Sequence, residues 1–195
     1  PSLDSLTDRE LVSRYVGRRD EIAFAALVRR HSSLVLGICQ RVLGHKQDVE
    51  DAFQATFLVL ARDAPRIRKR ESLASWLHGV AYRTSLRAAQ SRHRRIRLLQ
   101  DVTMIEDSSL ADVELRHQRQ LLDEELEALP EKYKAPLILH YLEGKTAQQV
   151  AESLKLTTFT VEGRLKRGRK ELHLRLVRRG IGLSIALAAL TATPQ

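Results

Sequence analysis

Residues 146–176 decide the fold, and they read TAQQVAESLKLTTFTVEGRLKRGRKELHLRL. Thr146 begins a short helical pattern that ends near Lys155, and a longer pattern begins at Thr157 or Thr158. Threonine suits a helix start because its hydroxyl accepts a backbone N–H of the first turn. A short helix, a tight turn and a longer helix form a helix-turn-helix. Lys155 occupies the turn, where glycine is common, so we expect it to have a positive φ.

The longer helix has two different faces. Its predicted buried stripe recurs every three to four residues and consists of Val161, Leu165, Gly168, Leu172 and Leu176. It is expected to pack on Val150, Ala151, Leu154 and Leu156. The opposite face carries Glu162, Gly163, Lys166, Arg167 and Lys170, flanked by Arg164 and Arg169. Guanidinium groups suit guanine edges and phosphates, and a carboxylate can accept from a cytosine amino group. This face therefore predicts major-groove binding; the alternative is a basic helical hairpin that binds no DNA.

Helical patterns continue on the N-terminal side of this motif. Thr7 and Glu10 have the spacing of a capping box. Further helices are expected over about 21–43, 47–62, 72 to beyond 89, 111–129 and 131–142. No strand pattern competes, so the predicted fold is all-α, with two small helical domains joined by a linker, the C-terminal one a helix-turn-helix. The expected boundaries are 1–95 for the first domain, 96–115 for the linker, 116–180 for the second domain and 181–195 for an apolar tail.

Charge is unevenly distributed along the chain, whose formal net charge is +9. Residues 66–97 carry ten Lys or Arg against one acid, and residues 164–179 carry eight against one. Between them, residues 98–127 carry nine acids against two arginines. Such a basic surplus predicts a polyanionic partner, either nucleic acid or an anionic membrane. Two basic blocks with an acidic connector favour two DNA-contacting modules, although solvated helix faces are an alternative.

Several motifs resemble those of bacterial sigma factors of the extracytoplasmic-function type. The C-terminal DNA-binding domain of that family is matched by Leu129-Pro130-Glu131-Lys132-Tyr133, by 137–144, by 146–151 and by 160–169. The stretch 48–57, DVEDAFQATF, resembles the family's polymerase-binding helix, and 75–83, SWLHGVAYR, resembles its promoter-melting helix. The resemblance covers roughly residues 6–180 in the right order. Ala55 and the pair Glu162-Gly163 depart from the family pattern, and the second departure leaves the promoter sequence open.

The resemblance implies three sets of site residues. Contact with duplex DNA at the −35 element is expected for Thr146, Gln148, Thr158, Thr160, Glu162, Gly163, Arg164, Lys166, Arg167 and Lys170. Contact with the single-stranded −10 element is expected for Arg68, Lys69, Arg70, Ser72, Arg83 and Arg87. Contact with core RNA polymerase is expected for Asp48, Asp51, Gln54 and Leu58. The polymerase elements implied are the clamp helices and the flap, and an anti-sigma factor is implied as a further partner.

Helical geometry gives independent support for the polymerase-binding helix. Val49, Phe53, Thr56, Phe57 and Leu60 share one side of a helical wheel, whereas Gln47, Asp51, Gln54 and Leu58 share the other. An exposed leucine beside carboxylate and amide groups suggests a partner surface, and an ordinary acidic helix face is the alternative. Trp76 lies on the apolar side of the following helix, so we expect it in the core.

Other functions find less support in the sequence. The seven histidines are scattered without metal-ligand spacing, and no Gly-rich phosphate loop is present, so no enzyme activity, catalytic residue, cofactor or metal site is expected. A stand-alone helix-turn-helix regulator with an N-terminal sensor or dimerisation domain remains the main alternative. The lone Cys39 fits a core position in a reducing cytoplasm.

The end of the chain is apolar. No charged residue occurs from Gly180 to Gln195, but a run of about 14 apolar residues is short of the roughly 20 that span a bilayer. One interpretation is an additional helix docked on a domain. The other is a segment of a longer native chain that would be bound to a membrane or a partner. We expect a cytoplasmic protein with no membrane association, unless the tail continues.

Overall fold

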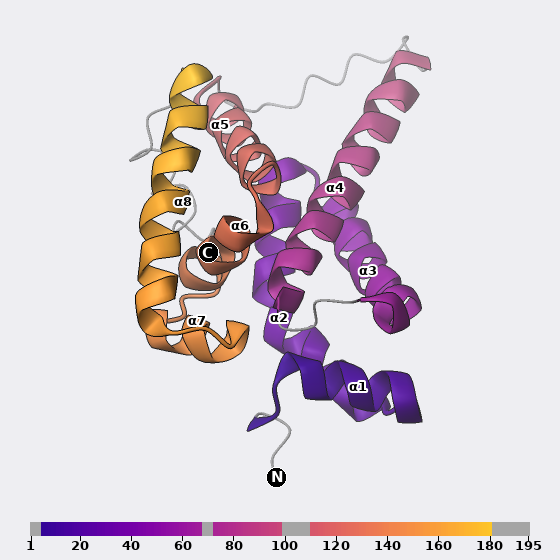
Figure 1. Ribbon diagram of the computed structural model, residues 1–195. Coiled ribbons are helices and arrows are strands. Elements are labelled where there is room, and N and C mark those ends of the chain that lie inside the picture. The colour runs from indigo at the N-terminus through magenta and orange to yellow at the C-terminus, as the bar shows by residue number, and fades with distance from the viewer. Residues whose placement is uncertain (1–4, 68–71, 99–109, 181–195) are drawn as a thin grey trace.

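The computed structural model describes residues 5–67, 72–98 and 110–180, and all regular structure within these ranges is helical. The N-terminal half consists of α1 (Asp8–Arg18), α2 (Glu21–Val42), α3 (Lys46–Asp63), the short 3-10 turn η2 (Ala64–Arg66) and α4 (Leu73–Leu98). The C-terminal half consists of α5 (Leu110–Glu127), α6 (Glu131–Leu137), the π-helical turn η4 (Ile138–Leu142), α7 (Ala147–Leu154) and α8 (Thr158–Arg178) (Figure 1). The all-α prediction is confirmed.

Helix α2 is the central element of the N-terminal half and packs against α1, α3 and α4. The side chain of Asp20 caps it by accepting a hydrogen bond from the N–H of Ala23 at 3.0 Å. Among the described helices, α2 is the one long and apolar enough to cross a membrane by length and composition. Its buried face, which includes Leu27, Val35 and Ile38, lies in the hydrophobic core. The apolar character of α2 is therefore that of a core helix.

The predicted helix starts are present. The hydroxyl of Thr7 accepts from the N–H of Glu10 at 3.3 Å, and the Glu10 carboxylate accepts from the N–H of Thr7 at 2.7 Å. Thr146 and Gln149 form the same reciprocal arrangement at the start of α7. Of the two threonines considered for α8, Thr157 is the cap, and it accepts from the N–H of Thr160 at 3.2 Å.

The turn of the helix-turn-helix is closed by a lysine in the left-handed conformation. Lys155 has φ 55° and ψ 47°, which confirms the expected positive φ. The N–H of Leu156 reaches the carbonyl of Ala151 at 2.9 Å, and that of Lys155 reaches the carbonyl of Glu152 at 3.3 Å. These two bonds form a Schellman motif, in which glycine is the usual left-handed residue. The turn therefore forms without glycine, at the cost of backbone strain at Lys155.

The helix predicted over residues 131–142 spans that range but changes type within it. Pro136 lies within α6, and the chain changes to the π-helical turn η4 directly after Leu137. Proline has no backbone N–H to donate to the carbonyl four residues earlier, and its ring pushes against that carbonyl. Pro130 is the N-cap of α6, with φ −54° and ψ 138°. The predicted helical range is therefore confirmed, and the π-helical turn is a change of hydrogen-bond pattern that was not predicted.

The segment expected as a linker is helical at both ends. Helix α4 continues to Leu98, and α5 begins at Leu110. Residues 99–109 lie outside the described part of the chain, as do the predicted tail at 181–195 and the loop at 68–71.

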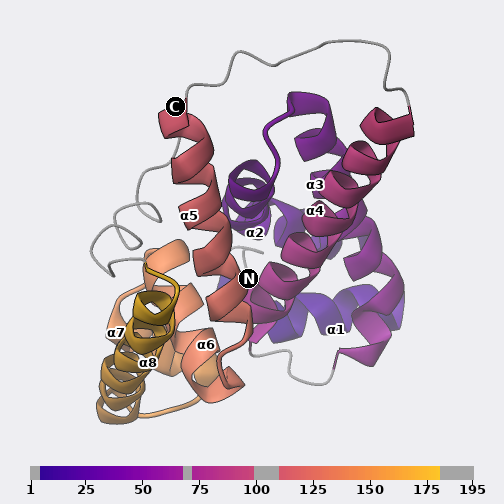
Figure 2. The same ribbon diagram turned by 90° about the horizontal axis from the view of Figure 1, so that it is seen from above.

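The two halves pack against each other. Helix α5 lies beside α2, and α4 contacts α5, α6 and η4. Figure 2 shows α5 between the N-terminal helices on one side and α6 to α8 on the other. Within the C-terminal half, α8 approaches α6 closely at Gly168, where an added Cβ would lie 3.1 Å from Leu137 and 3.2 Å from Tyr133. The absence of a side chain at Gly168 thus permits the packing that orients α8.

Candidate nucleic-acid interface

The predicted core stripe of α8 is buried. Val161, Leu165, Gly168, Leu172 and Leu176 are all buried, which confirms the periodicity argument. Val150 and Ala151 of α7 are buried beneath them, and Leu154 and Leu156 are partly buried against the same core. Since one face of α8 is fixed to the core, the opposite face must point outward.

The expected −35 residues lie at the surface of α7, α8 and their connection. Exposed side chains are those of Thr146, Gln148, Thr158, Glu162, Lys166, Arg167 and Lys170. Partly buried residues are Thr160, Gly163 and Arg164. The guanidinium of Arg167 folds back along the helix, where its Nε donates to the carbonyl of Gly163 at 3.1 Å. The hydroxyls of Thr146 and Thr160 take part in the caps of α7 and α8.

Carboxylates neutralise only the C-terminal part of the α8 basic block. Arg179 lies 2.7 Å from Glu124 and 2.8 Å from Glu125, and Arg175 lies 3.6 Å from Glu125. These acids belong to α5, so the acidic segment does more than connect two basic blocks. In the part of the chain that the structure describes, no carboxylate is within ion-pair distance of Arg164, Lys166, Arg167 or Lys170. The part of α8 before Glu171 therefore presents cations that no described carboxylate pairs with.

The residues expected at the −10 element are only partly described. Arg68, Lys69 and Arg70 lie outside the described residues. Arg83 and Arg87 are exposed on α4, and Arg83 Nη1 lies 3.5 Å from Glu127 Oε1 of α5.

Two residues near the start of α4, Ser72 and Trp76, are buried or packed against the core. Ser72 was expected to contact the −10 strand, which requires an exposed hydroxyl. The residue is only 8% exposed, so the structure does not place it at the surface. Trp76 is partly buried against the core, in agreement with its predicted position.

The two faces of α3 are arranged as the helical wheel predicted. Val49, Thr56, Phe57 and Leu60 are buried, and the Phe53 ring lies 5.1 Å from that of Phe57. Asp51 and Gln54 are exposed, and Leu58 is 70% exposed. Asp48 is half-buried and forms an ion pair with Arg92 of α4 at 3.3 Å. An apolar side chain is thus presented beside an acid and an amide on the outer face of α3.

Sequence reasoning missed a buried ion cluster between the two halves. The His78 side chain is fully buried, 3.1 Å from Asp123 and 3.1 Å from Glu127. Arg41 of α2 binds the buried Asp123 through two nitrogens at 2.8 and 2.9 Å. Burial would raise the pKa of Asp123, but Arg41 and His78 outweigh it and lower the pKa to about 2. Burial would lower the pKa of His78, but hydrogen bonds and charge from the two carboxylates outweigh it and raise the pKa above its ordinary value, which favours the charged imidazolium.

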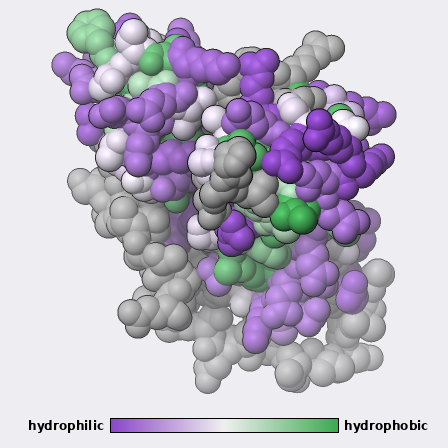
Figure 3. Space-filling model, turned by 90° about the horizontal axis from the view of Figure 1, so that it is seen from below, coloured by the Kyte–Doolittle hydropathy of each residue, from purple (hydrophilic) through white to green (hydrophobic). Residues whose placement is uncertain are grey.

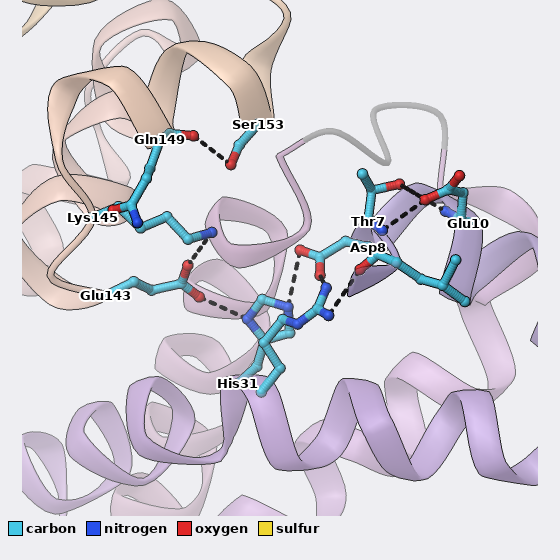
Figure 4. A network of polar contacts seen from close by, with 10 residues as sticks. Thr7, Asp8, Glu10, His31, Glu143, Lys145, Gln149 and Ser153 are labelled. Carbon is cyan, nitrogen blue, oxygen red and sulfur yellow. Dashed lines mark hydrogen bonds and ion pairs between the residues drawn. The ribbon is translucent and has the colours of Figure 1, made fainter. Parts of the chain in front are cut away.

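A second histidine joins the halves near α1. The His31 side chain of α2 is fully buried, 3.0 Å from Asp8 and 2.7 Å from Glu143. Glu143 also binds Lys145 at 3.0 Å, and Asp8 binds Arg30 at 2.7 Å (Figure 4). Burial alone would lower the pKa of His31, but hydrogen bonds to both carboxylates raise it to about 9. The imidazolium therefore links α1, α2 and the loop after η4.

Neither cluster resembles a catalytic or metal centre. Among the described residues, no group of three or more His, Cys, Asp or Glu is arranged to hold a metal ion. Cys39 is buried, and burial raises the pKa of its thiol, which lowers its reactivity. The chemistry that the surface offers is therefore charge and hydrogen bonding along α3, α4 and α8.

Comparison with known proteins identifies both halves. Residues 27–95 match the family described as Sigma-70 region 2, and residues 119–172 match the family described as Sigma-70, region 4. These two matches together account for more than half of the chain.

Relatives of similar length align with nearly the whole chain. The RNA polymerase sigma-H factor of Pseudomonas aeruginosa is 29% identical over 85% of this chain and 91% of its own length. The ECF RNA polymerase sigma-E factor of Haemophilus influenzae is 29% identical over 87% of this chain and 95% of its own length. A solved structure, the sigma factor RpoE with the anti-sigma factor NepR from Bartonella quintana, is 16% identical over 79% of this chain and 96% of that chain. Its TM-score of 0.39 is too low to inform on how the helices are arranged.

Proposed function

Because the chain belongs to the sigma-70 family as a sigma factor of the extracytoplasmic-function class, we propose that it binds core RNA polymerase and directs it to a specific set of promoters. It also helps to melt the −10 element. The chain is a transcription initiation factor and not an enzyme, so the chemistry of RNA synthesis belongs to the polymerase. We place it in the cytoplasm, where polymerase and chromosome are found.

The outward face of α8 is the observation that carries this proposal. The face is fixed by the buried stripe beneath it, and the part of α8 before Glu171 carries four cations that the described carboxylates do not neutralise, Arg164, Lys166, Arg167 and Lys170. A recognition helix in a major groove needs both properties, because phosphates supply affinity and base edges supply choice. Lys166, Arg167 and Lys170 contact DNA in this proposal, and Glu162 contributes to base choice.

The N-terminal half supplies the other two activities. Asp51, Gln54 and Leu58 of α3 bind the polymerase clamp, and the flap contacts the C-terminal half. Arg83 and Arg87 of α4 hold the released −10 strand together with Arg68, Lys69 and Arg70, which are assigned by family resemblance. Extruding a base costs a few kcal/mol, and contacts to the released strand offset that cost. An anti-sigma factor is a further proposed partner, on family membership alone.

The polymerase contact can be tested by titrating core RNA polymerase in a pull-down assay. A chain with Asp51→Ala and Gln54→Ala should bind core more weakly than the wild type while keeping its helicity, because both residues are exposed. Glu21→Gln is a matched control, since it removes an exposed carboxylate on another helix. Equal affinity of the double variant and the wild type would remove α3 as the polymerase-binding helix.

A second assay separates this proposal from a stand-alone regulator. Duplex promoter binding is measured by fluorescence anisotropy with and without core polymerase. A sigma factor should need core for tight, specific binding, whereas a stand-alone regulator should bind its duplex tightly alone.

A further inference from the structure

Phe159 is the most exposed large apolar side chain among the described residues. It is 85% exposed, compared with 70% for Leu58 and 68% for Ile22. Single apolar residues are common on protein surfaces, so exposure alone indicates little. The position of Phe159 on α8 is the reason to expect that this exposed side chain has a binding partner.

Phe159 lies in the first turn of α8, two residues after its N-cap Thr157. Gly163, Lys166 and Lys170 follow it at i+4, i+7 and i+11, a spacing that puts all four on one stripe of the helix. The buried stripe occupies the opposite side. Phe159 is therefore the N-terminal member of the outward face, in the part of a recognition helix that meets base edges.

The surroundings of Phe159 favour DNA as its contact. The next residue along the stripe is Gly163, which leaves the helix backbone without a side chain beside the ring. A Cβ at Gly163 would lie 3.2 Å from Arg167 Nη2, because the Arg167 guanidinium folds over this glycine. The ring thus lies one turn from a position without a side chain, on the same stripe as Lys166 and Lys170. Figure 3 shows the underside of the molecule, where hydrophilic surface predominates and apolar surface is confined to separate patches.

We propose that Phe159 contacts the 5-methyl group of a thymine in the −35 element. The thymine methyl is the apolar group that the major groove displays, and phenylalanine is among the side chains that contact it. Lys166 and Lys170 would meet phosphates on the same approach, whereas an apolar protein partner would have to desolvate both ammonium groups. This inference rests on the proposed function, because it requires α8 to enter the −35 major groove.

The test begins with selection of −35 sequences by the full chain bound to core polymerase. Each thymine of the selected duplex is then replaced by deoxyuridine, which removes only the methyl group. For the wild type, deoxyuridine in place of one particular thymine should lower the affinity for the duplex about fourfold, the effect expected for the loss of one buried methyl group. Phe159→Ala should show no loss at that position and the same losses as the wild type elsewhere.

Two further variants keep the experiment interpretable. Phe159→Leu retains apolar surface and should keep part of the response to deoxyuridine. Leu174→Ala removes another exposed apolar side chain of α8, about 22 Å further along the helix, and should behave as the wild type. Since Phe159 is exposed, none of these changes is expected to prevent folding.

The outcomes separate this inference from the function on which it rests. Selected sequences without thymine, or the same deoxyuridine response in the wild type and Phe159→Ala, would overturn the thymine contact and leave the sigma-factor function intact. Weaker core binding by Phe159→Ala with unchanged thymine preference would overturn it in favour of a protein contact. If the wild type with core selects no −35 sequence at all, the proposed function fails, and the inference fails with it.

Discussion

The cations of α8 fall into two groups according to whether a carboxylate lies beside them. Arg175 and Arg179 are held by acids of α8 and α5, whereas Lys166 and Arg167 are not paired in the described part of the chain. A cation already neutralised within the protein releases few counterions from DNA, because it must first leave its partner. The residues that bind phosphate should therefore come from the part of α8 that precedes Glu171.

The first prediction concerns Arg167. Arg167→Ala should weaken promoter binding and reduce the slope of log affinity against log salt by about 1, the value expected for one lost phosphate contact. Arg175→Ala is the matched control, because Arg175 is paired with Glu171 at 3.2 Å and should leave the slope nearly unchanged. Affinity measured from low to physiological salt gives both slopes. Equal slopes for Arg167→Ala and the wild type would show that Arg167 does not contact phosphate.

The helix-turn-helix as an element depends on a strained connection and a close approach. Lys155 adopts the left-handed conformation, and Gly168 allows α8 to pack on α6. Both features were accessible to sequence reasoning, since the first follows from the absence of glycine in the turn and the second from the apolar stripe. The change from α-helix to π-helix after Leu137 was not predicted, although Pro136 is visible in the sequence two residues before the π-helical turn begins. The residues of the turn, the apolar stripe and the prolines therefore explain the local structure of this element.

The second prediction concerns that strained turn. Lys155→Gly should raise the free energy of unfolding by about 0.5–1 kcal/mol, because glycine adopts a positive φ without steric cost. Lys155→Ala should bring no such gain, since it retains the Cβ that causes the strain. Urea denaturation followed by circular dichroism measures both. A gain with alanine as large as with glycine would locate the effect in the lysine side chain instead of the backbone.

The whole molecule is held together by ion clusters that local patterns could not predict. Glu143 is 112 residues from His31 in the sequence, and Asp123 is 45 residues from His78. Helical periodicity identified the faces of α3 and α8 because it depends on neighbours three and four residues apart. It contains no information about which buried histidine meets which distant carboxylate. The acids of α5 were consequently interpreted as part of a connector, although they form the interface between the halves.

The third prediction concerns Asp123, whose side chain is fully buried between Arg41 and His78. Asp123→Asn should lower the free energy of unfolding by about 3–5 kcal/mol, because both cations lose a buried counter-charge. Arg179→Ala is the control, since Arg179 is exposed to solvent where it pairs with Glu124 and Glu125, and its loss should lower stability much less than the loss of Asp123. Urea denaturation compares the two variants with the wild type. Similar small losses in both would mean that the buried cluster does not hold the halves together.

The fourth prediction concerns pH. The pKa of His31 is raised to about 9 in the folded protein from an ordinary value of 6.5, so its contribution to stability is complete below pH 6.5 and is lost as pH rises to 9. The carboxylates of Asp8 and Asp123, with pKa values lowered to about 2, act in the opposite sense and lose their contribution only in acid. Stability should therefore fall between pH 6.5 and 9.

Two measurements check this dependence. The urea midpoint of the wild type is followed from pH 5 to 9, and the fall should be smaller in His31→Gln, with a remainder from the raised pKa of His78. Titration of the wild-type imidazoles by NMR should show His31 protonated at neutral pH. The groups that face His31 are Asp8, Glu143, Arg30 and Lys145, so their titration belongs to the same equilibrium. A His31 pKa near 6.5 would contradict the charged bridge.

Run-off transcription with purified core polymerase is the most direct test of the assignment as a sigma factor. Templates randomised around the −35 and −10 elements are transcribed by core alone, by core with the wild-type chain, and by core with the Asp51→Ala and Gln54→Ala chain. The wild type should yield transcripts from a subset of templates that share both elements, and the double variant should yield far fewer. No transcript above core alone, together with tight binding of the chain to duplex DNA without polymerase, would contradict the assignment and make the protein a stand-alone regulator.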